Sequence, residues 1–249
     1  MSEHIVVEQG GPVTVVRMNR PDKKNAITRA MYAAMAAALT ASDADPSVRV
    51  RVILGVPGSF TSGNDLADFL AVAQGGEGGT EVYDFLMALA KAQKPLVSGV
   101  DGIAVGIGTT INLHCDLTFA TPRTVFHTPF VDLGLVPEAG SSLIAPAVLG
   151  RQQAFALLGL AEGFTAERAQ AAGLIYKVVP EDGLEAEVFA AAEAICAKPP
   201  EALRLARDLM LGDRQALVAR IEEEATLFRA RLKSDEARNA FMAFMARKK

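Results

Sequence analysis

The sequence has few of the features that mark metal-binding, membrane-spanning or nucleic-acid-binding proteins. It has only two cysteines, Cys115 and Cys196, and neither belongs to a CxxC or Cys/His ligand spacing, so a structural zinc site is excluded. We expect both to be reduced core thiols. No apolar run approaches the roughly 20 residues that a membrane helix needs. The 25 basic and 29 acidic residues are mixed along the chain, so no basic stripe would bind a phosphate backbone.

The two ends of the sequence lack the features of a targeting signal. Residues 1–11 have no cationic segment followed by an apolar one, as a signal peptide would. The last five residues, MARKK, are not a peroxisomal address of the SKL type. We therefore expect a cytoplasmic protein with neither a membrane nor a nucleic acid as partner.

Strands and helices alternate to about residue 180, and helical patterns follow. Alternating hydrophobicity and turn residues predict strands in residues 5–9, 13–18, 48–56, 96–100 and 116–120. Capping and stop residues predict helices in residues 28–41, 81–92, 139–149 and 165–173. The tail from about Leu184 is helical and is broken at Pro199-Pro200 and at Gly212. This order predicts an α/β core followed by a helical tail.

Two glycine-rich segments, residues 57–66 and 101–108, each combine a strand, a tight turn and a helix N-terminus. Such a turn leaves backbone N–H groups unpaired and directed at whatever binds there. A further glycine cluster at positions 75, 76, 78 and 79 predicts a flexible lid.

Neither glycine-rich turn fits a nucleotide-binding motif. Gly58 and Gly63 have the spacing of a phosphate-binding loop, but Asn64 follows where that loop needs a lysine. Gly106 and Gly108 begin a dinucleotide-type pattern, but an isoleucine occupies the third glycine position and no acidic residue follows at the required distance. Nucleotide hydrolysis and a dinucleotide-binding fold are therefore disfavoured.

Several segments, in order and over nearly the whole chain, resemble the crotonase (enoyl-CoA hydratase/isomerase) superfamily. They are residues 19–26 (NRPDKKNA), 59–66 (SFTSGNDL), 101–108 (DGIAVGIG), 115–120 (CDLTFA), 133–137 (LGLVP), 150–154 (GRQQA) and 165–169 (TAERA). The resemblance implies a spiral of ββα units in residues 1–190 and a C-terminal helical trimerisation region in residues 191–249. It also implies an acyl-CoA substrate, a homotrimer or dimer of trimers, and no cofactor, since CoA is part of the substrate.

The family's shared chemistry is formation of a thioester enolate, whose negative oxygen two backbone N–H groups stabilise. Such donors contribute about 3–4 kcal/mol each in other oxyanion holes. The resemblance assigns this role to the amides of Asn64 and Ile107. The second position is more usually glycine in the family, so we expect Ile107 to narrow the pocket near the thioester.

The carboxylates of the chain distinguish isomerisation from hydration. The two glutamates of family hydratases fall on Thr110 and Phe130, neither of which can act as a base, so we expect hydration to be weak or absent. Glu138, within residues 136–142 (VPEAGSS), instead resembles the single catalytic glutamate of the peroxisomal type of Δ3,Δ2-enoyl-CoA isomerase. The resemblance therefore implies that Glu138 moves a proton from C2 to C4 of a 3-enoyl-CoA.

The protonation of Glu138 depends on two opposing effects. An apolar wall, for which Phe130, Leu135 and Val136 are candidates, would raise the pKa of its carboxyl group. A position at a helix N-terminus would lower that pKa, because the helix dipole favours the charged form. The residues alone leave the outcome open, and they also allow Glu138 to be an ordinary helix-start residue.

The remaining candidate residues are assigned mainly by resemblance. Lys24 is a CoA phosphate contact or a solvated loop lysine, and His127 is a residue of the acyl pocket. His114 is expected to be a core histidine and Asp132 a possible second acid, while Lys248 and Lys249 either reach CoA or form a frayed end. The full set of predicted substrate-binding residues is Lys24, Ala26, Ser62, Asp65, Leu66, Gly106, Thr110, His127 and Phe130; Asp65 is also a candidate helix cap.

Two other functions remain open at this point. The chain is alternatively a hydratase or another thioester-enolate enzyme that uses Asp132 or His127. It is alternatively an acyl-CoA-binding protein without catalytic activity.

Overall fold

The structure is a computed structural model that describes residues 2–65, 67–68 and 79–247. Leu66 and the predicted lid at positions 75, 76 and 78 lie outside the described residues, as do Lys248 and Lys249. No helix in the described part of the chain is long and apolar enough to cross a membrane.

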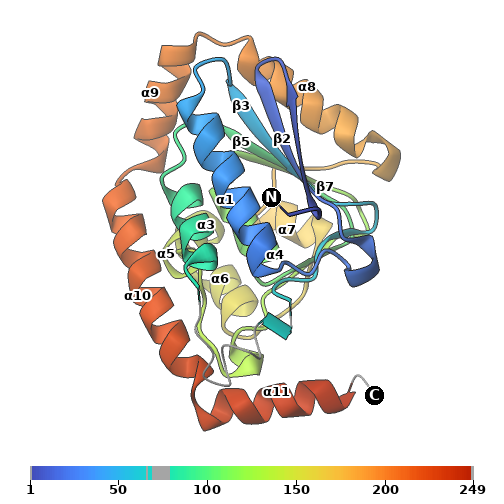
Figure 1. Cartoon of the computed structure of the whole chain (residues 1–249), viewed down its shortest axis with the longest axis vertical. Helices are drawn as coiled ribbons and strands as arrows, with labels where there is room; N and C mark the ends of the chain where they lie inside the picture. Colours follow the sequence, from blue (N-terminus) through green and yellow to red (C-terminus); the bar gives the residue numbers. More distant parts are fainter. Residues whose placement is uncertain (1, 66, 69–78, 248–249) are drawn as a thin grey trace.

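A six-stranded sheet, in the order β1-β2-β3-β5-β7-β10, forms the centre of the molecule (Figure 1). The first two strands pair antiparallel, which confirms the predicted hairpin, and every later pair in this sheet is parallel. The strands are β1 (Ile5–Gly10), β2 (Val13–Met18), β3 (Val50–Leu54), β5 (Leu96–Val100), β7 (Leu117–Ala120) and β10 (Lys177–Val178).

A second, four-stranded sheet has the order β4-β6-β8-β9. Its strands are β4 (Ser59–Thr61), β6 (Ile103–Val105), β8 (Val125–His127) and β9 (Phe164–Thr165). Along the chain, β3, β5 and β7 of the first sheet are each followed by a strand of the second sheet, namely β4, β6 and β8. Successive strand pairs therefore wind through both sheets, and this arrangement confirms the predicted α/β spiral of ββα units.

The helices begin and end mostly where local signals predict. Thr28 accepts a hydrogen bond from Met31 N at the start of α1, and Thr165 accepts one from Arg168 N at the start of α7. Gly212 (φ 69°) separates α9 from α10. The helices are α1 (Arg29–Ala44), α3 (Glu81–Ala90), α4 (Ile107–Thr110), α5 (Ser141–Leu149), α6 (Arg151–Leu158), α7 (Ala166–Ala172), α8 (Leu184–Cys196), α9 (Pro200–Leu211), α10 (Arg214–Leu232) and α11 (Asp235–Arg247), and the 3-10 helices are η1 (Pro21–Lys23), η2 (Ile111–His114), η3 (Val131–Leu133) and η4 (Glu181–Gly183).

Strand β3 shows how the sheet separates two apolar cores. All five of its residues are buried, because helices cover both faces of a mostly parallel sheet. Val50, Val52 and Leu54 belong to the smaller cluster, which includes α8, whereas Ile53 belongs to the larger cluster with residues of α1 and α3. This strand is shorter than the predicted 48–56.

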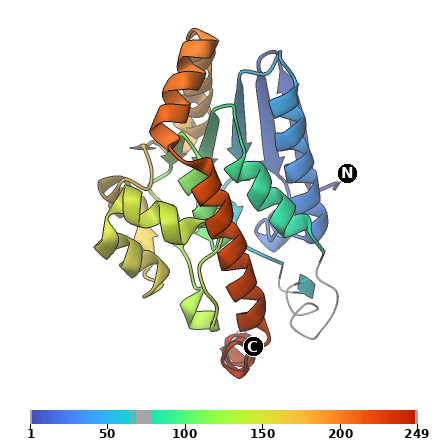
Figure 2. The same ribbon diagram turned by 90° about the vertical axis from the view of Figure 1, so that its left-hand side faces the viewer.

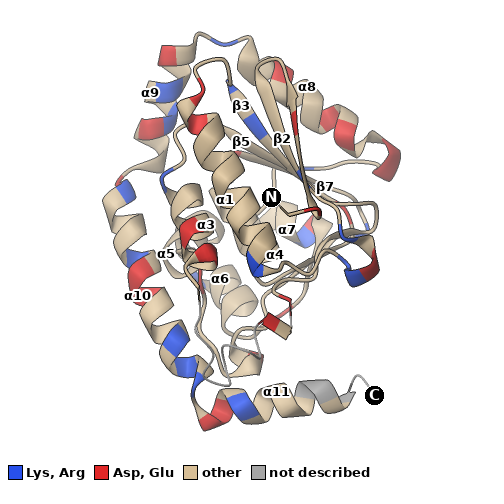
Figure 3. Ribbon diagram, viewed as in Figure 1, with Lys and Arg blue, Asp and Glu red and all other residues tan. Residues whose placement is uncertain are grey.

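Helices α9, α10 and α11 run down one side and along one end of the molecule (Figures 1 and 2). Helix α8 packs against β3, β5 and β7, so the predicted boundary at residue 190 falls within a helix that covers the sheet. Acidic and basic residues are interspersed along α9 and α10 (Figure 3). Helix α10 also contacts α3 and α5, which places it beside the candidate site.

Candidate active site

The ends of β4 and β6 carry two backbone turns that pack tightly together. A Cβ atom on Gly108 would lie 2.4 Å from Thr61 Cγ2, and one on Gly63 would lie 3.0 Å from Val105 O. Gly63 also has a φ of 88°, which side chains other than that of glycine rarely allow. The glycines therefore let the segment that leads to Asn64 lie directly against the β6–α4 turn.

The amides of Asn64 and Ile107 follow these two parallel strands. Ile27 forms a parallel β-bridge with Asn64: Ile27 N donates to Gly63 O, and Ile27 O accepts from Asp65 N. Neither hydrogen bond uses the amide of Asn64. Among the described residues, neither the Asn64 nor the Ile107 amide donates a hydrogen bond to the protein. Unpaired backbone amides are the kind of donor that an oxyanion hole uses.

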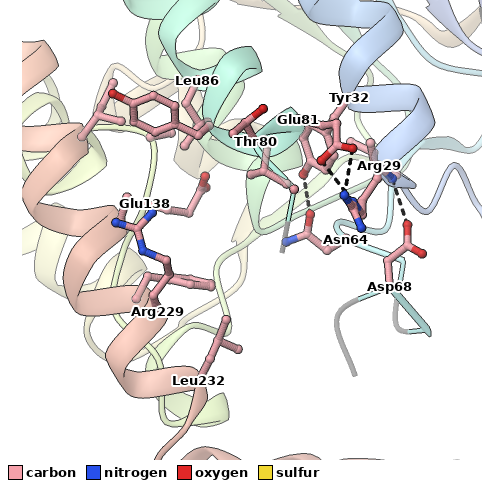
Figure 4. Close-up of a pocket in the computed structure, with 18 of the residues that line it drawn as sticks. Arg29, Tyr32, Asn64, Asp68, Thr80, Glu81, Leu86, Glu138, Arg229 and Leu232 are labelled. Atoms are coloured by element: carbon pink, nitrogen blue, oxygen red, sulfur yellow. Dashed lines mark hydrogen bonds and ion pairs between the residues drawn. The ribbon is translucent and has the colours of Figure 1, made fainter. Parts of the chain in front are cut away.

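The side chain of Asn64 is held from α1. Tyr32 is 1% exposed, and its hydroxyl group donates a short hydrogen bond to Asn64 Oδ1 (Figure 4). Burial raises the pKa of Tyr32 well above its usual value, and the charge of Glu138 raises it further, so the phenol stays protonated and remains a donor.

Glu138 lies in a strained turn rather than in the first turn of a helix. The helix predicted from Ala139 begins at Ser141, because Ala139 (φ 61°) and Gly140 (φ 69°) both have left-handed backbone conformations. A non-glycine residue in this region costs free energy and requires support from its surroundings. His114 provides part of it: the Nε2 atom of its buried ring lies 2.7 Å from Ala139 O and must carry the proton, because a carbonyl only accepts.

The N-terminus of α5 is capped by a different carboxylate. Glu224 of α10 accepts hydrogen bonds from Gly140 N (2.6 Å) and Ser142 N (3.0 Å). Glu138 accepts from Ser141 N through its backbone carbonyl at 3.1 Å, but among the described residues its carboxyl group makes no hydrogen bond to α5. The helix N-terminus thus interacts with Glu224, and the ordinary helix-start role considered for Glu138 is not seen.

The carboxyl group of Glu138 is buried and has one hydrogen-bond donor among the described residues. Thr110 Oγ1 donates to Glu138 Oε1 at 2.6 Å, and the residue is 9% exposed. Burial raises the pKa of Glu138 to about 8; the Thr110 hydrogen bond opposes this shift, and the charge of Glu224 adds to it. A carboxyl group with a pKa near neutrality is suited to both accept and return a proton.

Glu138 and Asn64 line the same cavity, which has a volume of ≈ 470 Å³. In Figure 4 the Glu138 side chain points toward the side of the cavity where Asn64 lies. Most of the remaining lining is apolar and comes from α1, α3 and α10, including Tyr32, Val82, Leu86, Ile221, Ala225, Phe228 and Leu232. A cavity of this kind fits an apolar chain that carries a polar group at one end.

The other carboxylates that line the cavity have different partners. Asp65 pairs with Arg20 at 2.6 Å and also accepts from Ala67 N, which is the capping role considered for it. Glu81 pairs with Arg29 at 2.9 Å, and Asp68 accepts from Arg29 N at 2.8 Å (Figure 4). Glu222 accepts from the hydroxyl group of Tyr83 at 3.2 Å. Glu138 alone among the described lining carboxylates is buried, and its donor is the neutral hydroxyl group of Thr110.

The structure places the predicted substrate-binding residues in three groups. Asp65 lines the cavity, and Thr110 lies behind it as the donor to Glu138. Lys24, Ala26 and Ser62 lie on the outer loops, where Ser62 N donates to Lys24 O at 2.9 Å and Lys24 is exposed. Gly106, His127 and Phe130 lie behind the second turn, where Gly106 N donates to His127 O at 2.8 Å.

The predicted narrowing of the cavity by Ile107 is not seen. Ile107 is 2% exposed and packs in the larger apolar core, so its side chain does not narrow the described cavity. Phe130 packs in the same core. A Cβ atom added to Gly106 would lie 3.9 Å from Cε1 of the Phe130 ring. Asp132 is exposed and lies in η3, away from the lining residues.

Tyr32 and Glu224 are structural elements of the site that the sequence did not reveal. Tyr32 has no motif of its own and is one residue in an alanine-rich helix. Glu224 belongs to the acidic run 222–224, which is typical of a solvated face. One signal was present: Ile221, Glu224 and Phe228 have helical spacing, which places Glu224 on the apolar stripe of α10.

Known proteins resemble this chain over almost its full length. Enoyl-CoA delta isomerase 2 of Rattus norvegicus is 38% identical over 253 residues, which cover 99% of this chain and 64% of the relative. Enoyl-CoA delta isomerase 3, peroxisomal, of Mus musculus is 34% identical and covers 99% of this chain and 80% of the relative. The structure of Pseudomonas aeruginosa OdaA superposes with a TM-score of 0.93 at 42% identity and covers 98% of this chain and 99% of that one.

The chain spans about two thirds of the length of the rat protein. The family model described as enoyl-CoA hydratase/isomerase matches residues 8–249. The chain therefore belongs to the enoyl-CoA hydratase/isomerase family, the crotonase superfamily expected from its motifs.

Proposed function

We propose that this protein is an enoyl-CoA isomerase that converts 3-enoyl-CoA thioesters to 2-enoyl-CoA thioesters, with Glu138 as the only acid–base group. The observation that carries the proposal is the buried carboxyl group of Glu138, which lines the same apolar cavity as Asn64 and has a pKa of about 8. The isomerase names of the rat and mouse relatives support the same reaction.

The reaction needs one base and an oxyanion site. The carboxylate of Glu138 takes a proton from C2, and the electron pair of that C–H bond forms a dienolate whose oxygen the Asn64 and Ile107 amides bind. The Glu138 carboxylic acid then gives the proton to C4, and the product has its double bond between C2 and C3. The proton leaves and returns to the same substrate, so no water is consumed and the carboxylate is regenerated.

Hydration would require a second group to activate water. The two positions where family hydratases carry glutamates hold Thr110 and Phe130, and both side chains are buried. Thr110 is a neutral hydroxyl group that donates a hydrogen bond to Glu138, so it does not supply a base. We infer that hydration of 2-enoyl-CoA is much slower than isomerisation.

Product analysis tests the proposal and separates it from its alternatives. The purified protein is incubated with 3-enoyl-CoA and, separately, with 2-enoyl-CoA, and the thioesters are identified by liquid chromatography and mass spectrometry. We expect 2-enoyl-CoA from the first substrate and no 3-hydroxyacyl-CoA from the second. Rapid hydration would identify a hydratase, and binding without turnover of either thioester would identify an acyl-CoA-binding protein.

We also propose that the protein assembles as a homotrimer or a dimer of trimers. Exposed apolar side chains on α9 support association, since Leu209 is 85% exposed and Met210 is 78% exposed. The mass in solution, measured by light scattering, checks this proposal; a monomer at micromolar concentration contradicts it.

A further inference from the structure

Glu224 connects the C-terminal helix α10 to the turn that carries Glu138. It is 4% exposed, and its two carboxylate oxygens each accept one backbone N–H group, from Gly140 and from Ser142. Arg220, one helical turn earlier, donates to Ser142 Oγ at 3.3 Å. Helix α10 therefore binds both Gly140 and Ser142 in the segment that follows the proposed base.

This turn depends on long-range contacts. Ala139 and Gly140 are consecutive left-handed residues, and Glu224 is 84 positions after Gly140, so the contact with α10 is a tertiary one. A backbone of this kind persists only where its surroundings support it. Ionised carboxylates form strong hydrogen bonds with backbone N–H groups at a helix N-terminus, so Glu224 is well suited to that support.

We propose that Glu224 is a positioning residue for catalysis: it fixes the turn 138–142 so that the Glu138 carboxyl group faces the cavity. The negative charge of Glu224 behind the turn also favours the protonated form of Glu138. The inference rests on the proposed function of Glu138 as the base. It adds that the C-terminal helical region takes part in the chemistry, in addition to any role in assembly.

Several titratable groups surround Glu138, and they differ in whether they carry a charge that shifts its pKa. Tyr32 of α1 remains a neutral phenol because burial raises its pKa. His114 of η2 remains neutral above about pH 5, because burial lowers its pKa to about 4. Burial raises the pKa of Glu224 itself, while the hydrogen bonds from Ser142 and Gly140 and the positive charge of Arg220 oppose this shift and favour the ionised carboxylate. Of the charges that face Glu138 from these elements, that of Glu224 is the one that raises its pKa.

The experiment compares Glu224→Gln and Glu224→Asp with a matched control, Asp213→Asn. Asp213 accepts two backbone N–H groups, Gln215 N at 2.8 Å and Ala216 N at 3.3 Å, but it lies at the N-terminal end of α10, whereas Glu224 lies near the middle of that helix. The control therefore replaces a capping carboxylate by an amide without changing the turn. Circular dichroism and gel filtration confirm that each variant is folded.

The first readout is the dependence of kcat/KM on pH with 3-enoyl-CoA. Glu224→Gln removes a like charge near Glu138, so we expect the acidic limb of the kcat/KM profile to move about one pH unit lower. We also expect kcat to fall at least tenfold, because the turn loses one of its two carboxylate acceptors. Glu224→Asp keeps the charge but is one methylene group shorter, so we expect kcat to fall while the limb stays in place. Asp213→Asn should match the wild type.

The second readout needs no substrate. Carbon-13 NMR of side-chain carboxyl groups follows the titration of Glu138, whose signal is assigned by its loss in Glu138→Gln. We expect its pKa to be lower in Glu224→Gln than in the wild type. An unchanged pKa together with an unchanged kcat in folded Glu224→Gln would overturn the inference, and a wild-type protein that does not isomerise 3-enoyl-CoA would instead overturn the proposed function.

Discussion

Thr110 donates a hydrogen bond of 2.6 Å to Glu138. By the family resemblance, Thr110 occupies a position that holds a catalytic glutamate in hydratases, so we expect a neutral donor here in place of a second carboxylate. The contact joins α4, which begins at the proposed oxyanion residue Ile107, to the turn that carries the proposed base. One hydroxyl group therefore links the two parts of the proposed site.

Removal of this donor should raise the pKa of Glu138. The Thr110 hydrogen bond lowers that pKa, so Thr110→Val should move the acidic limb of kcat/KM about one pH unit higher and reduce the rate at pH 7 several-fold. Thr110→Ser keeps the hydroxyl group and serves as the control. A Thr110→Val profile that coincides with that of the wild type would show that the hydrogen bond does not act on the base.

The buried carboxyl group of Glu138 should make the protein less stable as the pH rises. Its folded pKa of about 8 exceeds its ordinary value of 4.5, so the native state retains a proton that the unfolded chain releases. The free energy of unfolding therefore decreases as the pH rises from about 4.5 to about 8. Glu138→Gln carries no titrating group at this position. The free energy of unfolding of Glu138→Gln minus that of the wild type should therefore be about 1–3 kcal/mol larger at pH 8.5 than at pH 5.

Urea unfolding of the wild type and Glu138→Gln at the two pH values measures this difference. The exposed Glu162, which pairs with Arg168 at 2.7 Å, provides the control variant Glu162→Gln. That substitution should leave the pH dependence unchanged. A stability gap between wild type and Glu138→Gln that is constant with pH would mean that Glu138 titrates as an ordinary carboxyl group.

Tyr32 should contribute to catalysis through Asn64. Tyr32→Phe removes the hydroxyl group that binds Asn64 Oδ1 while it retains the aromatic ring, which packs 5.5 Å from that of Phe85. The loss of one buried hydrogen bond, about 1 kcal/mol, corresponds to a fall of roughly fivefold in kcat. Tyr176→Phe, at an exposed tyrosine, should leave kcat unchanged; equal rates for the two variants would exclude a role for the Tyr32–Asn64 contact.

Local sequence signals predicted most of the elements, because the relevant interactions are local. The capping contact of Thr28, the break at Gly212 and the alternation along β1 and β2 each involve residues close together in the chain. The start of α5 was misplaced by two residues, since Ala139 and Gly140 adopt left-handed conformations that the alanine at position 139 does not signal.

The site was less accessible from sequence. Resemblance identified Glu138, Asn64 and Ile107 as candidates, but the balance between burial and the helix dipole at Glu138 was open. It is decided by Glu224, which is 84 residues away from Gly140 and takes the helix N-terminus in place of Glu138. The contact between Tyr32 and Asn64 likewise joins distant segments. Such contacts depend on the assembled fold and leave only weak marks in sequence patterns.

The most direct test of the account is the rate at which Glu138→Gln isomerises 3-enoyl-CoA at pH 8, compared with the wild type and Glu162→Gln. If Glu138 is the acid–base group, kcat falls by about 10²- to 10⁴-fold in the folded Glu138→Gln protein, while Glu162→Gln retains the wild-type rate. A Glu138→Gln enzyme that isomerises the substrate within a few-fold of the wild-type rate would contradict the account.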